Sequence, residues 1–467
     1  MLILLGSFLV LMILGLPVAL AMAVSSLLYI LVTGVAPDVV LAQRMIAGVE
    51  SFPLLAVPFF ILAGNLMNIA GVTGRIYRFA VALVGWMKGG LGQVNILGSV
   101  IFSGMSGTAL ADAAGLGTIE IKAMKDHGYS TEFAVGVTAA SATLGPIIPP
   151  SLPFVIYGMM ANVSIGALFL GGLVPGLVMT LMMMATVAFF AHRNGWGSDT
   201  PFSWTQLGEA TLEVAIVLAF PVAVWVMIQA GLSTNLAIGL ALAVLLALDW
   251  WYDFSAVMAL MAPVILIGGM TMGLFTPTEA AVAAVAWALF LGFAWYRTLT
   301  LRMFVKVSMD TIETTAVVLF IVASASIFAW VLTTTRVTDA IGVWVLSISD
   351  NPYVFLLLAN LFLLFVGCFM ETIAAITILV PVFMPIIAKL GIDPVHFGLV
   401  MVLNLMIGLL TPPVGMVLFV LQKVSKLSFE ATVRAIVPWM IPLLGTLAII
   451  TYWPSGVMWL PSVLFPK

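Results

Sequence analysis

The amino-acid sequence predicts an all-α protein that crosses a membrane many times, and three observations support this prediction. Of the 467 residues, 63% are hydrophobic and only 7% are charged, whereas an average soluble domain has about 25% charged residues. Long uncharged runs recur along the chain, and two of them contain the same helix-breaking motif. Because backbone groups in a bilayer must be satisfied within helices, we expect about a dozen helices.

The uncharged runs are long enough to supply most of these helices at about 20 residues per crossing. These runs are 1–37, 133–192, 214–248, 314–335, 394–422 and 435–466. The first run has no basic residue ahead of it and is longer than the apolar core of a signal peptide. We therefore interpret it as a retained membrane helix.

Charge and motif content disfavour several classes of function. The formal net charge is -3 and there is no dense basic cluster, which argues against nucleic acid as a partner. The single cysteine and the three histidines form no pattern for haem or copper. No P-loop, dinucleotide fingerprint or HExxH motif occurs. We therefore expect neither an enzyme nor a resident cofactor, and the driving energy must come from elsewhere.

The segment "TLGPIIPPSLP", residues 143–153, interrupts one of the apolar runs with a glycine and four prolines. Proline removes a backbone donor and clashes with the preceding turn, so no regular helix can pass through this segment. In a membrane, the freed backbone groups are tolerated only where they are buried in protein or line a wet cavity. The break is therefore either a packing device or a binding site.

A second copy of the break, "IGLLTPPVG", occupies residues 407–415. The first prolines of the two pairs differ by 412 minus 149, which is 263, and the preceding glycines by 408 minus 145, again 263. The same shift relates three further pairs, Gly104 and Gly367, Gly128 and Gly391, and Pro175 and Pro438. Two independently kinked helices would not share this register, so we infer an internal repeat.

Each copy predicts a re-entrant hairpin followed by a broken helix. The apolar segments on either side of "SGMSGT", residues 103–108, are each short for a full crossing, so this stretch is expected to form a hairpin tip. Duplicated halves with discontinuous helices are typical of secondary transporters, in which the freed amides and carbonyls bind substrate and cation. The helix breaks are then the expected sites.

Polar residues near the first tip are candidate ligands. Ser103, Ser106 and Thr108 offer hydroxyl oxygens of the kind that a hard cation such as Na+ binds. Small residues also favour tight helix packing in membranes, which is an alternative reason for their presence. Asp112 follows in an apolar helix, where a carboxylate is costly unless it is paired, hydrated or neutralised. It has either a coupling role or a role in stabilising the hairpin.

The second half has its own candidates. Glu371, just past Gly367, either binds a proton or cation or caps the following helix, where the helix dipole favours negative charge. Thr372 lies beside it. Thr411 precedes the double proline and can present both its hydroxyl and its carbonyl at the break.

The stretch "LFTPTEAAVAAV", residues 274–285, also contains an acid in an apolar context. Thr276 as N-cap, Pro277 at the first helical position and Glu279 at the third form the pattern of a capping box. This stretch therefore predicts a helix start and not a cation site.

Taken together, these motifs resemble the large membrane subunit of tripartite ATP-independent periplasmic (TRAP) transporters. The resemblance covers nearly the whole chain and rests on "SGMSGTALADAAGLGTIEIKAMKDHGYS", "GPIIPPS", "GLFTPTEAA", "ETIAAITILVPVFMPI" and "GLLTPPVG". Residues 211–253 match least well, because a shorter connection is expected there, so we expect an extra apolar hairpin.

The resemblance implies a Na+-coupled, elevator-type symporter in the bacterial inner membrane. It implies uptake of a small organic acid, such as a C4-dicarboxylate, sialic acid or a 2-oxo acid. It also implies two partners, a small four-helix membrane subunit and a periplasmic substrate-binding protein. The implied division of the chain is 1–90 scaffold, 91–192 first transport repeat, 193–352 scaffold and connection, 353–453 second transport repeat and 454–467 tail.

By position, the resemblance implies one Na+ site at each break. The residues of the first are Ser103, Ser106, Thr108, Gly145, Ile148 and Pro150. Those of the second are Gly367, Thr372, Gly408 and Thr411. Asp112 and Glu371 are further candidates for substrate binding or coupling.

Two other readings are open. One is a stand-alone cation-coupled or proton-coupled carboxylate or anion transporter of another elevator family. The other is a redox-linked proton-pumping subunit, which would carry intramembrane ionisable residues along a relay. The chain has no lysine at the centre of an apolar run, and this counts against the proton pump.

Overall fold

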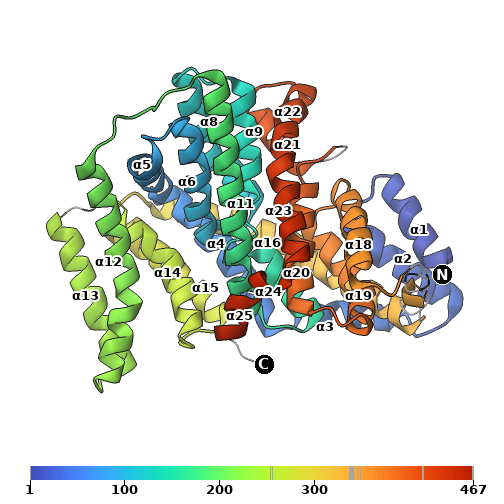
Figure 1. The fold of residues 1–467 in the computed structure, drawn as a ribbon. Coiled ribbons are helices and arrows are strands. Elements are labelled where there is room, and N and C mark those ends of the chain that lie inside the picture. Colours follow the sequence, from blue (N-terminus) through green and yellow to red (C-terminus); the bar gives the residue numbers. More distant parts are fainter. Residues whose placement is uncertain are drawn as a thin grey trace.

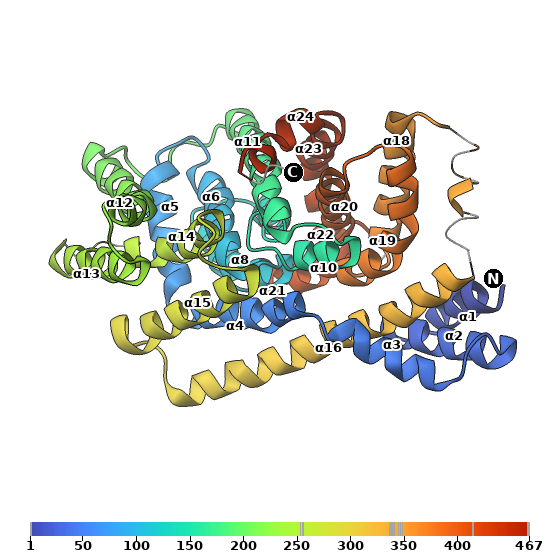
Figure 2. The same cartoon turned by 90° about the horizontal axis from the view of Figure 1, so that it is seen from below.

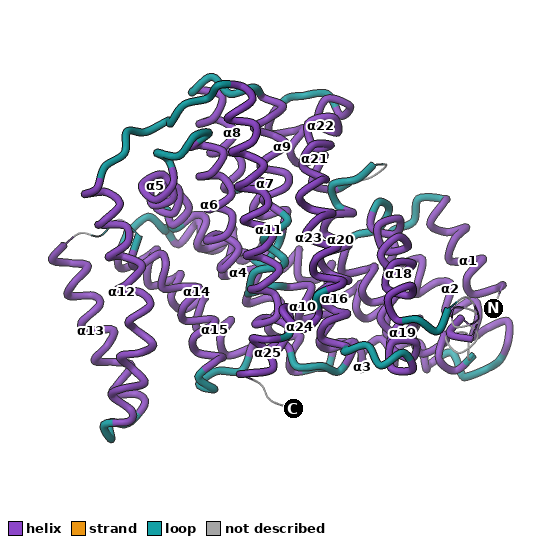
Figure 3. The backbone as a smooth tube through the Cα atoms, in the orientation of Figure 1, coloured by secondary structure: helices purple, strands orange, loops and turns teal. Residues whose placement is uncertain are grey.

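The computed structural model describes residues 2–252, 254, 256–335, 341–343, 345, 347, 349–412 and 415–464. All the named elements in these ranges are helices, which confirms the predicted all-α fold (Figure 3). Eight of the described helices are long and apolar enough to cross a membrane, judged by length and composition. Several shorter apolar helices accompany them.

The N-terminal part of the chain, as far as residue 194, forms a succession of mostly short helices. They are α1 (Leu2–Ile13), α2 (Val18–Thr33), α3 (Val39–Val49), η1 (Phe52–Leu55), α4 (Ala56–Ile69), α5 (Val72–Val84), α6 (Gly90–Ser106), α7 (Ala109–Ala114), α8 (Leu116–Asp126), α9 (Thr131–Ala142), α10 (Leu152–Ala161) and α11 (Ile165–Asn194). The first apolar run therefore forms two helices, because Gly15 and Pro17 separate α1 from α2.

The remaining helices begin with a long pair. They are α12 (Trp204–Gln229), α13 (Thr234–Tyr252), α14 (Val257–Thr271), α15 (Pro277–Leu289), η2 (Phe290–Trp295), α16 (Leu301–Thr334), α18 (Pro352–Gly367), α19 (Thr372–Lys389), α20 (Pro394–Gly408), α21 (Met416–Ser425), α22 (Phe429–Ile436), η3 (Val437–Trp439), α23 (Met440–Tyr452), α24 (Pro454–Val457) and α25 (Trp459–Leu464).

The helix boundaries of the two halves follow the 263-residue offset of the sequence motifs. α7 begins at Ala109 and α19 at Thr372, and 372 minus 109 is 263. α9 begins at Thr131 and α20 at Pro394, and 394 minus 131 is also 263. α9 and α20 also end alike, because both stop at the proline-containing segments, after which the chain continues as α10 and α21.

The two halves contact each other reciprocally. The segment after the first break, α10, packs against α19, the second arm of the second hairpin (Figure 2). The segment after the second break, α21, packs against α7, at the start of the second arm of the first hairpin. Each broken helix is therefore held partly by the hairpin of the other half.

The broken helices lie in the centre of the molecule. All residues from 133 to 142 in α9 and from 395 to 408 in α20 are buried. A helix that is apolar around its whole circumference is expected at the interior of a bundle. The core of the protein is therefore formed around the same two helices that the prolines interrupt.

The periphery is formed by long helices. α16 spans 34 residues and runs along one edge of the molecule, in contact with α2, α3, α4 and α19 (Figure 2). α12 and α13 form a hairpin at the opposite end from α1 and α2 (Figure 1). This is the apolar hairpin expected within 211–253, although Asp253 itself lies outside the described residues.

The predicted capping box is also present. The Thr276 side chain accepts from the Glu279 amide, and the Glu279 carboxylate accepts from the Thr276 amide at 2.8 Å. Glu279 therefore starts α15, as its position three residues after a threonine predicts.

Candidate functional site

The tip of the first hairpin lies directly against the first helix break. The Leu152 amide, at the start of α10, donates to the Gly107 carbonyl over 3.4 Å. A Cβ atom on Gly107 would lie 2.8 Å from the Pro150 carbonyl oxygen. A Cβ atom on Gly145 would lie 3.1 Å from the Thr108 carbonyl oxygen. Glycine at both positions therefore lets backbone oxygens of the opposing segment approach closely.

The hydroxyls of Ser103 and Thr108 at this tip each make one local hydrogen bond. Ser103 is fully buried, and its Oγ donates to the Val100 carbonyl at 2.6 Å. Thr108 Oγ1 accepts from the Ala111 amide at 3.3 Å and so caps α7. A hydroxyl oxygen has two acceptor lone pairs, so both oxygens keep capacity for a cation. The side chain of Ser106 lies outside the described residues.

Ile148 contributes to the first break through its backbone. Its side chain packs towards α11, where a Cβ atom on Gly176 would lie 2.5 Å from Ile148 Cγ1. The side chain is therefore a packing group. The structure thus brings the backbone of Gly107 against Pro150 and that of Gly145 against Thr108.

The second hairpin approaches the second break even more closely. A Cβ atom on Gly408 would lie 2.5 Å from the Gly367 Cα atom and 3.0 Å from its carbonyl oxygen. No residue with a side chain fits this contact without moving one of the two backbones. The end of α18 and the end of α20 are thus in direct backbone contact.

Thr411 joins the same contact with its side chain. Its Oγ1 donates to the Gly408 carbonyl at 2.7 Å and lies 2.9 Å from the Cys368 Sγ atom. The hydroxyl is therefore at the meeting point of the break and the hairpin. Pro413 and Val414, the next part of this break, lie outside the described residues.

The start of α19 shows the contacts of Glu371. Its carboxylate accepts from the Ile373 amide at 2.9 Å and from the Ala374 amide at 3.3 Å, so it caps the helix. The neighbouring Thr372 hydroxyl is buried and has no hydrogen-bond partner among the described residues. A buried hydroxyl without a partner is costly and marks a place where a ligand atom would be stabilising.

Asp112 is another buried group without a well-aligned partner. It lies on α7 with a relative exposure of 1%, and neither carboxylate oxygen makes a well-aligned hydrogen bond within the described residues. The Ser99 hydroxyl is the polar group that faces it. A carboxylate in this setting is stable only with a bound proton or a nearby cation.

A polar network continues from Ser99 into the core between α6, α8 and α9. The Ser99 hydroxyl donates to Ser141, whose hydroxyl donates to the Asn95 side-chain carbonyl at 2.7 Å. The Asn95 amide donates to Glu120 Oε2 at 2.6 Å and to Thr138 Oγ1 at 2.8 Å. Glu120 is also 1% exposed, so two buried carboxylates flank this network.

Sequence reasoning missed most of this network. Glu120 lies in a segment with two lysines and an aspartate, and this composition is typical of a solvated loop. A signal was nevertheless present on α6, where Asn95, Ser99 and Ser103 recur at intervals of four residues in an apolar helix. This spacing places polar groups along one helix face.

The chemistry of both breaks suits a hard cation. The atoms that converge there are backbone carbonyl and hydroxyl oxygens, together with one thiol in the second half. No group of three or more His, Cys, Asp or Glu that could hold a metal occurs in the part of the chain that the structure describes. Carbonyl and hydroxyl oxygens are ligands that hard cations prefer.

Comparison with known proteins identifies the family. The model of the tripartite ATP-independent periplasmic transporter, DctM component, matches residues 5–255 and 250–455. The sialic acid TRAP transporter large permease protein SiaM of Vibrio cholerae is 41% identical over 449 residues, covering 96% of this chain and 95% of SiaM. The C4-dicarboxylate large permease DctM of Pseudomonas aeruginosa is 37% identical, covering 92% of this chain and 91% of DctM.

Two further comparisons concern architecture. The sialic acid permease SiaT of Haemophilus influenzae is 36% identical, covering 98% of this chain but only 68% of SiaT. Among solved structures, the YdaH transporter of Alcanivorax borkumensis has a TM-score of 0.54 at 15% identity, covering 89% of each chain. The YdaH likeness concerns the fold alone. The family match confirms the resemblance seen in the motifs, and the chain therefore belongs to the DctM family of large permease subunits of TRAP transporters, which makes it a multi-pass inner-membrane transport protein and not an enzyme.

Proposed function

We propose that this permease couples Na+ entry to the uptake of a small organic acid, by an elevator mechanism. The observation that carries the proposal is the direct contact of each helix break with a hairpin tip, made by Gly107 and Pro150 in one half and by Gly367 and Gly408 in the other. Paired broken helices of this kind supply carbonyl oxygens to cations and helix N-termini to anionic substrates. SiaM and DctM are large permeases for sialic acid and C4-dicarboxylates, which are both carboxylates.

The first Na+ site is formed by the backbones around Thr108, Gly145, Ile148 and Pro150, with Ser103 and Ser106 nearby. The second is formed around Gly367, Gly408 and Thr411, with Thr372 supplying a further oxygen. The close backbone approach at Gly107 and Gly408 supports this assignment, because it excludes water from the contact. In a low-dielectric site the oxygen dipoles then interact strongly with the ion.

The two carboxylates have different roles in this proposal. Glu371 positions the first turn of α19, and Thr372 with it, because its carboxylate is already engaged with two amides. Asp112 is the coupling candidate, because both of its oxygens lie buried without a well-aligned bond. The acid substrate binds at the N-termini of α10 and α21, which begin directly after the breaks.

The moving body consists of the two hairpins and the two broken helices. It corresponds to the repeats 91–192 and 353–453, which pack on each other through α10 with α19 and α21 with α7. The frame comprises 1–90 and 193–352, and the tail is 454–467, of which residues 465–467 lie outside the described set. α16 is 34 residues long and lies along one edge. It contacts α2, α3 and α4 of the frame as well as α19 of the moving body, which supports a role for α16 in the frame.

Two partners complete the proposed system, a periplasmic binding protein that delivers the acid and a small four-helix membrane subunit. About a third of SiaT has no counterpart in this chain, which leaves room in that protein for a second membrane component. Substrate choice is then shared between the binding protein and the permease.

The test is uptake of labelled C4-dicarboxylate or sialic acid into proteoliposomes that contain this chain and its small subunit, with the binding protein outside. We expect uptake with an inward Na+ gradient and none with choline or without the binding protein. ATP should have no effect. Uptake that persists without Na+ and collapses with a protonophore would contradict Na+ coupling. Robust uptake by the large chain alone would instead support a stand-alone transporter.

A further inference from the structure

The two segments that join the first transport repeat to the rest of the chain lie against each other. Residues 85–90 lead from α5 into α6, and residues 195–203 lead from α11 into α12 across the upper left of Figure 3. We call residues 85–90 and 195–200 together the strap. The strap contributes no atom to the two proposed cation sites, so its contacts have another role.

Backbone hydrogen bonds pair the two halves of the strap. The Gly89 amide donates to the Gly197 carbonyl at 3.0 Å. In the other direction, the Thr200 amide donates to the Gly85 carbonyl at 3.3 Å. The chain therefore enters and leaves the first repeat through one antiparallel pair of segments.

The outgoing half of the strap also caps the first helix of the hairpin. Gly89 is the N-cap residue of α6, and it has no side chain that could accept from the free amides of the first turn. The Asp199 carboxylate takes this role, because its Oδ2 atom accepts from the Leu91 amide at 2.8 Å. The helix dipole further favours a negative charge at this end. Asp199 thus ties the segment that leaves the repeat to the helix with which the repeat begins.

The same half of the strap is attached to the region where α8 leads into α9. The Tyr129 hydroxyl donates to Asp199 Oδ2 at 2.6 Å. The Tyr129 and Trp196 rings lie with their centroids 4.7 Å apart, and Phe133 contacts Trp196 edge to face at 4.6 Å. Leu91, Tyr129 and Phe133 all belong to the first transport repeat, so the strap is fixed to that repeat at three places.

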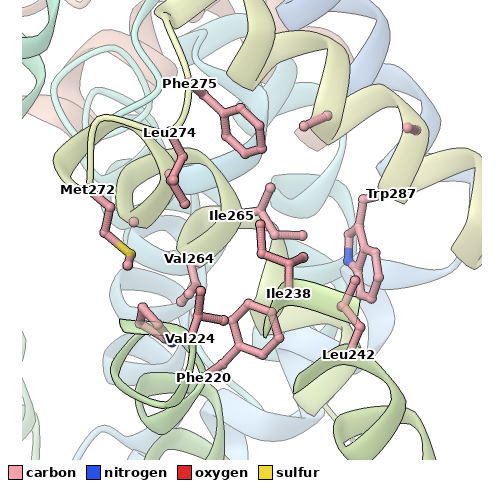
Figure 4. Close-up of a pocket in the computed structure, with 15 residues that line it drawn as sticks. Phe220, Val224, Ile238, Leu242, Val264, Ile265, Met272, Leu274, Phe275 and Trp287 are labelled. Carbon is pink, nitrogen blue, oxygen red and sulfur yellow. The ribbon is translucent and has the colours of Figure 1, made fainter. Parts of the chain in front are cut away.

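The helix that follows the strap is held by other helices. α12 packs against α5, α13 and α14. Phe220 and Val224 of α12 line an apolar cavity of about 320 Å³ together with Val264 and Ile265 of α14 (Figure 4). These helices belong to the proposed frame, so the chain passes from the moving body to the frame between Thr200 and the start of α12.

We propose, on the basis of the proposed elevator function, that the strap moves as one unit with the first hairpin and that Asp199 is the positioning residue that locks it there. Two separate linkers could each follow its own path when a domain moves, whereas a paired strap makes both ends of the repeat move together. The start of α6 and the end of α11 then keep a fixed spacing throughout transport. The chain bends outside the strap, before Gly85 and after Thr200.

Disulfide cross-linking in proteoliposomes that contain this chain and its small subunit, with the binding protein outside, tests the fixed spacing. Lys88 and Ser198 form an antiparallel bridge and are both exposed. Opposite residues in such a pair have Cα atoms about 4.5–5.5 Å apart, within the range of a disulfide. Na+-driven uptake by oxidised Lys88→Cys/Ser198→Cys should stay within about twofold of uptake by the same protein after reduction, because the link joins segments that do not separate.

A second link joins the moving body to the frame. A Cβ atom on Gly104 of α6 would lie 2.8 Å from the Cβ atom of Pro263 in α14. A shift of about 1 Å then gives the Cβ separation of a disulfide. Oxidation of Gly104→Cys/Pro263→Cys should abolish uptake, and reduction should restore it. Labelling of free thiols with a polyethylene glycol maleimide measures the linked fraction, and the oxidised parental protein corrects for any reaction of Cys368.

Variants of Asp199 test the lock itself. Asp199→Ala removes the acceptor for Leu91 and Tyr129, so the maximal uptake rate per folded protein should fall at least about threefold, with half-saturation by Na+ and by the acid unchanged. Amides of the strap should also exchange hydrogen faster. Asp199→Asn keeps one carbonyl oxygen as acceptor and should retain most of the rate. The matched control is Asp38→Ala, which removes the side-chain cap of α3 in the frame and should change neither the rate nor exchange in the strap.

The two links give outcomes that separate the strap from the elevator itself. Loss of uptake in both oxidised double variants would mean that the halves of the strap separate during transport, which overturns the strap but leaves the elevator. Retained uptake in both would contradict a moving body and overturn the strap with it. A lower amount of folded Asp199→Ala protein with an unchanged rate per molecule would make Asp199 a structural cap and not a lock.

Discussion

The Thr411 hydroxyl lies 2.9 Å from Cys368 Sγ and donates to the Gly408 carbonyl, so one side chain joins the second helix break to the second hairpin. The two residues are 43 positions apart in the sequence. A cation bound here would therefore contact both elements at once. Its departure would loosen the hairpin from the broken helix, which is the kind of coupling that a symporter requires.

Thr411→Val tests whether this hydroxyl binds Na+. Valine keeps the branched shape and removes one oxygen, so a lost hydrogen bond alone would cost about 1 kcal/mol of stability. If the hydroxyl is a ligand, we expect the apparent Na+ affinity of uptake to fall about tenfold, or about 1.4 kcal/mol. The measurement is initial uptake against Na+ concentration, normalised to the amount of protein in the membrane.

Two variants control for packing in this experiment. Cys368→Ala removes the sulfur neighbour but leaves the hydroxyl, so Na+ dependence should be unchanged. Thr276→Val removes the cap of α15 and should lower the amount of folded protein without altering Na+ dependence. An unchanged Na+ curve for Thr411→Val would leave the second break with a backbone role only.

Gly408→Ala tests the backbone contact between the second break and the second hairpin. The new Cβ atom would lie 2.5 Å from the Gly367 Cα atom, so α20 and α18 must separate. We expect destabilisation of about 1–3 kcal/mol and loss of uptake. Thermal unfolding in detergent and proteoliposome uptake measure the two effects.

The matched control is Gly239→Ala on α13. No heavy atom lies within 4 Å of the Cβ position there. Alanine in an open helical position should stabilise by up to about 1 kcal/mol, and uptake should be unaffected. Equal behaviour of the two variants would show that the Gly367–Gly408 contact has no special role.

Asp112→Asn tests the buried carboxylate that lacks a well-aligned bond. The substitution preserves shape and removes the possibility of charge. Because an unpaired buried charge is costly, we expect equal or greater thermal stability. We also expect uptake to fall by at least tenfold if Asp112 is a coupling group. Normal uptake together with raised stability would show that Asp112 neither couples transport to a cation nor stabilises the hairpin.

The two helix breaks could be predicted because proline and glycine act locally on the backbone. Pro149 and Pro412 interrupt their helices whatever surrounds them. The capping box of Thr276 and Glu279 is equally local and equally predictable. The alternatives for Glu371 stayed open in the sequence, because a carboxylate before a helix in an apolar run fits both a cap and an ion ligand.

The interior network could not be predicted in the same way, because burial is a property of the folded chain. Glu120 is close to two lysines in sequence, yet α8 turns it towards α6 and α9. The proximity of Cys368 to Thr411 likewise depends on how α18 meets α20. Ile148 was expected near a cation, and only the packing against Gly176 shows that its side chain points to α11.

A double-mutant cycle on Asn95 and Glu120 tests whether the interior network stabilises the first hairpin. Asn95→Ala removes the amide that donates to Glu120 Oε2 at 2.6 Å and leaves a buried carboxylate without this donor. We expect a loss of about 3–5 kcal/mol, as for a broken buried charge interaction. Glu120→Gln in the Asn95→Ala background removes the charge and should recover much of the loss, giving a coupling energy above about 0.5 kcal/mol. Urea or thermal unfolding of the four proteins in the same detergent provides the values. Strictly additive changes in the free energy of unfolding would contradict this prediction. They would mean that the 2.6 Å hydrogen bond between Asn95 and Glu120 does not stabilise the packing of α6 against α8.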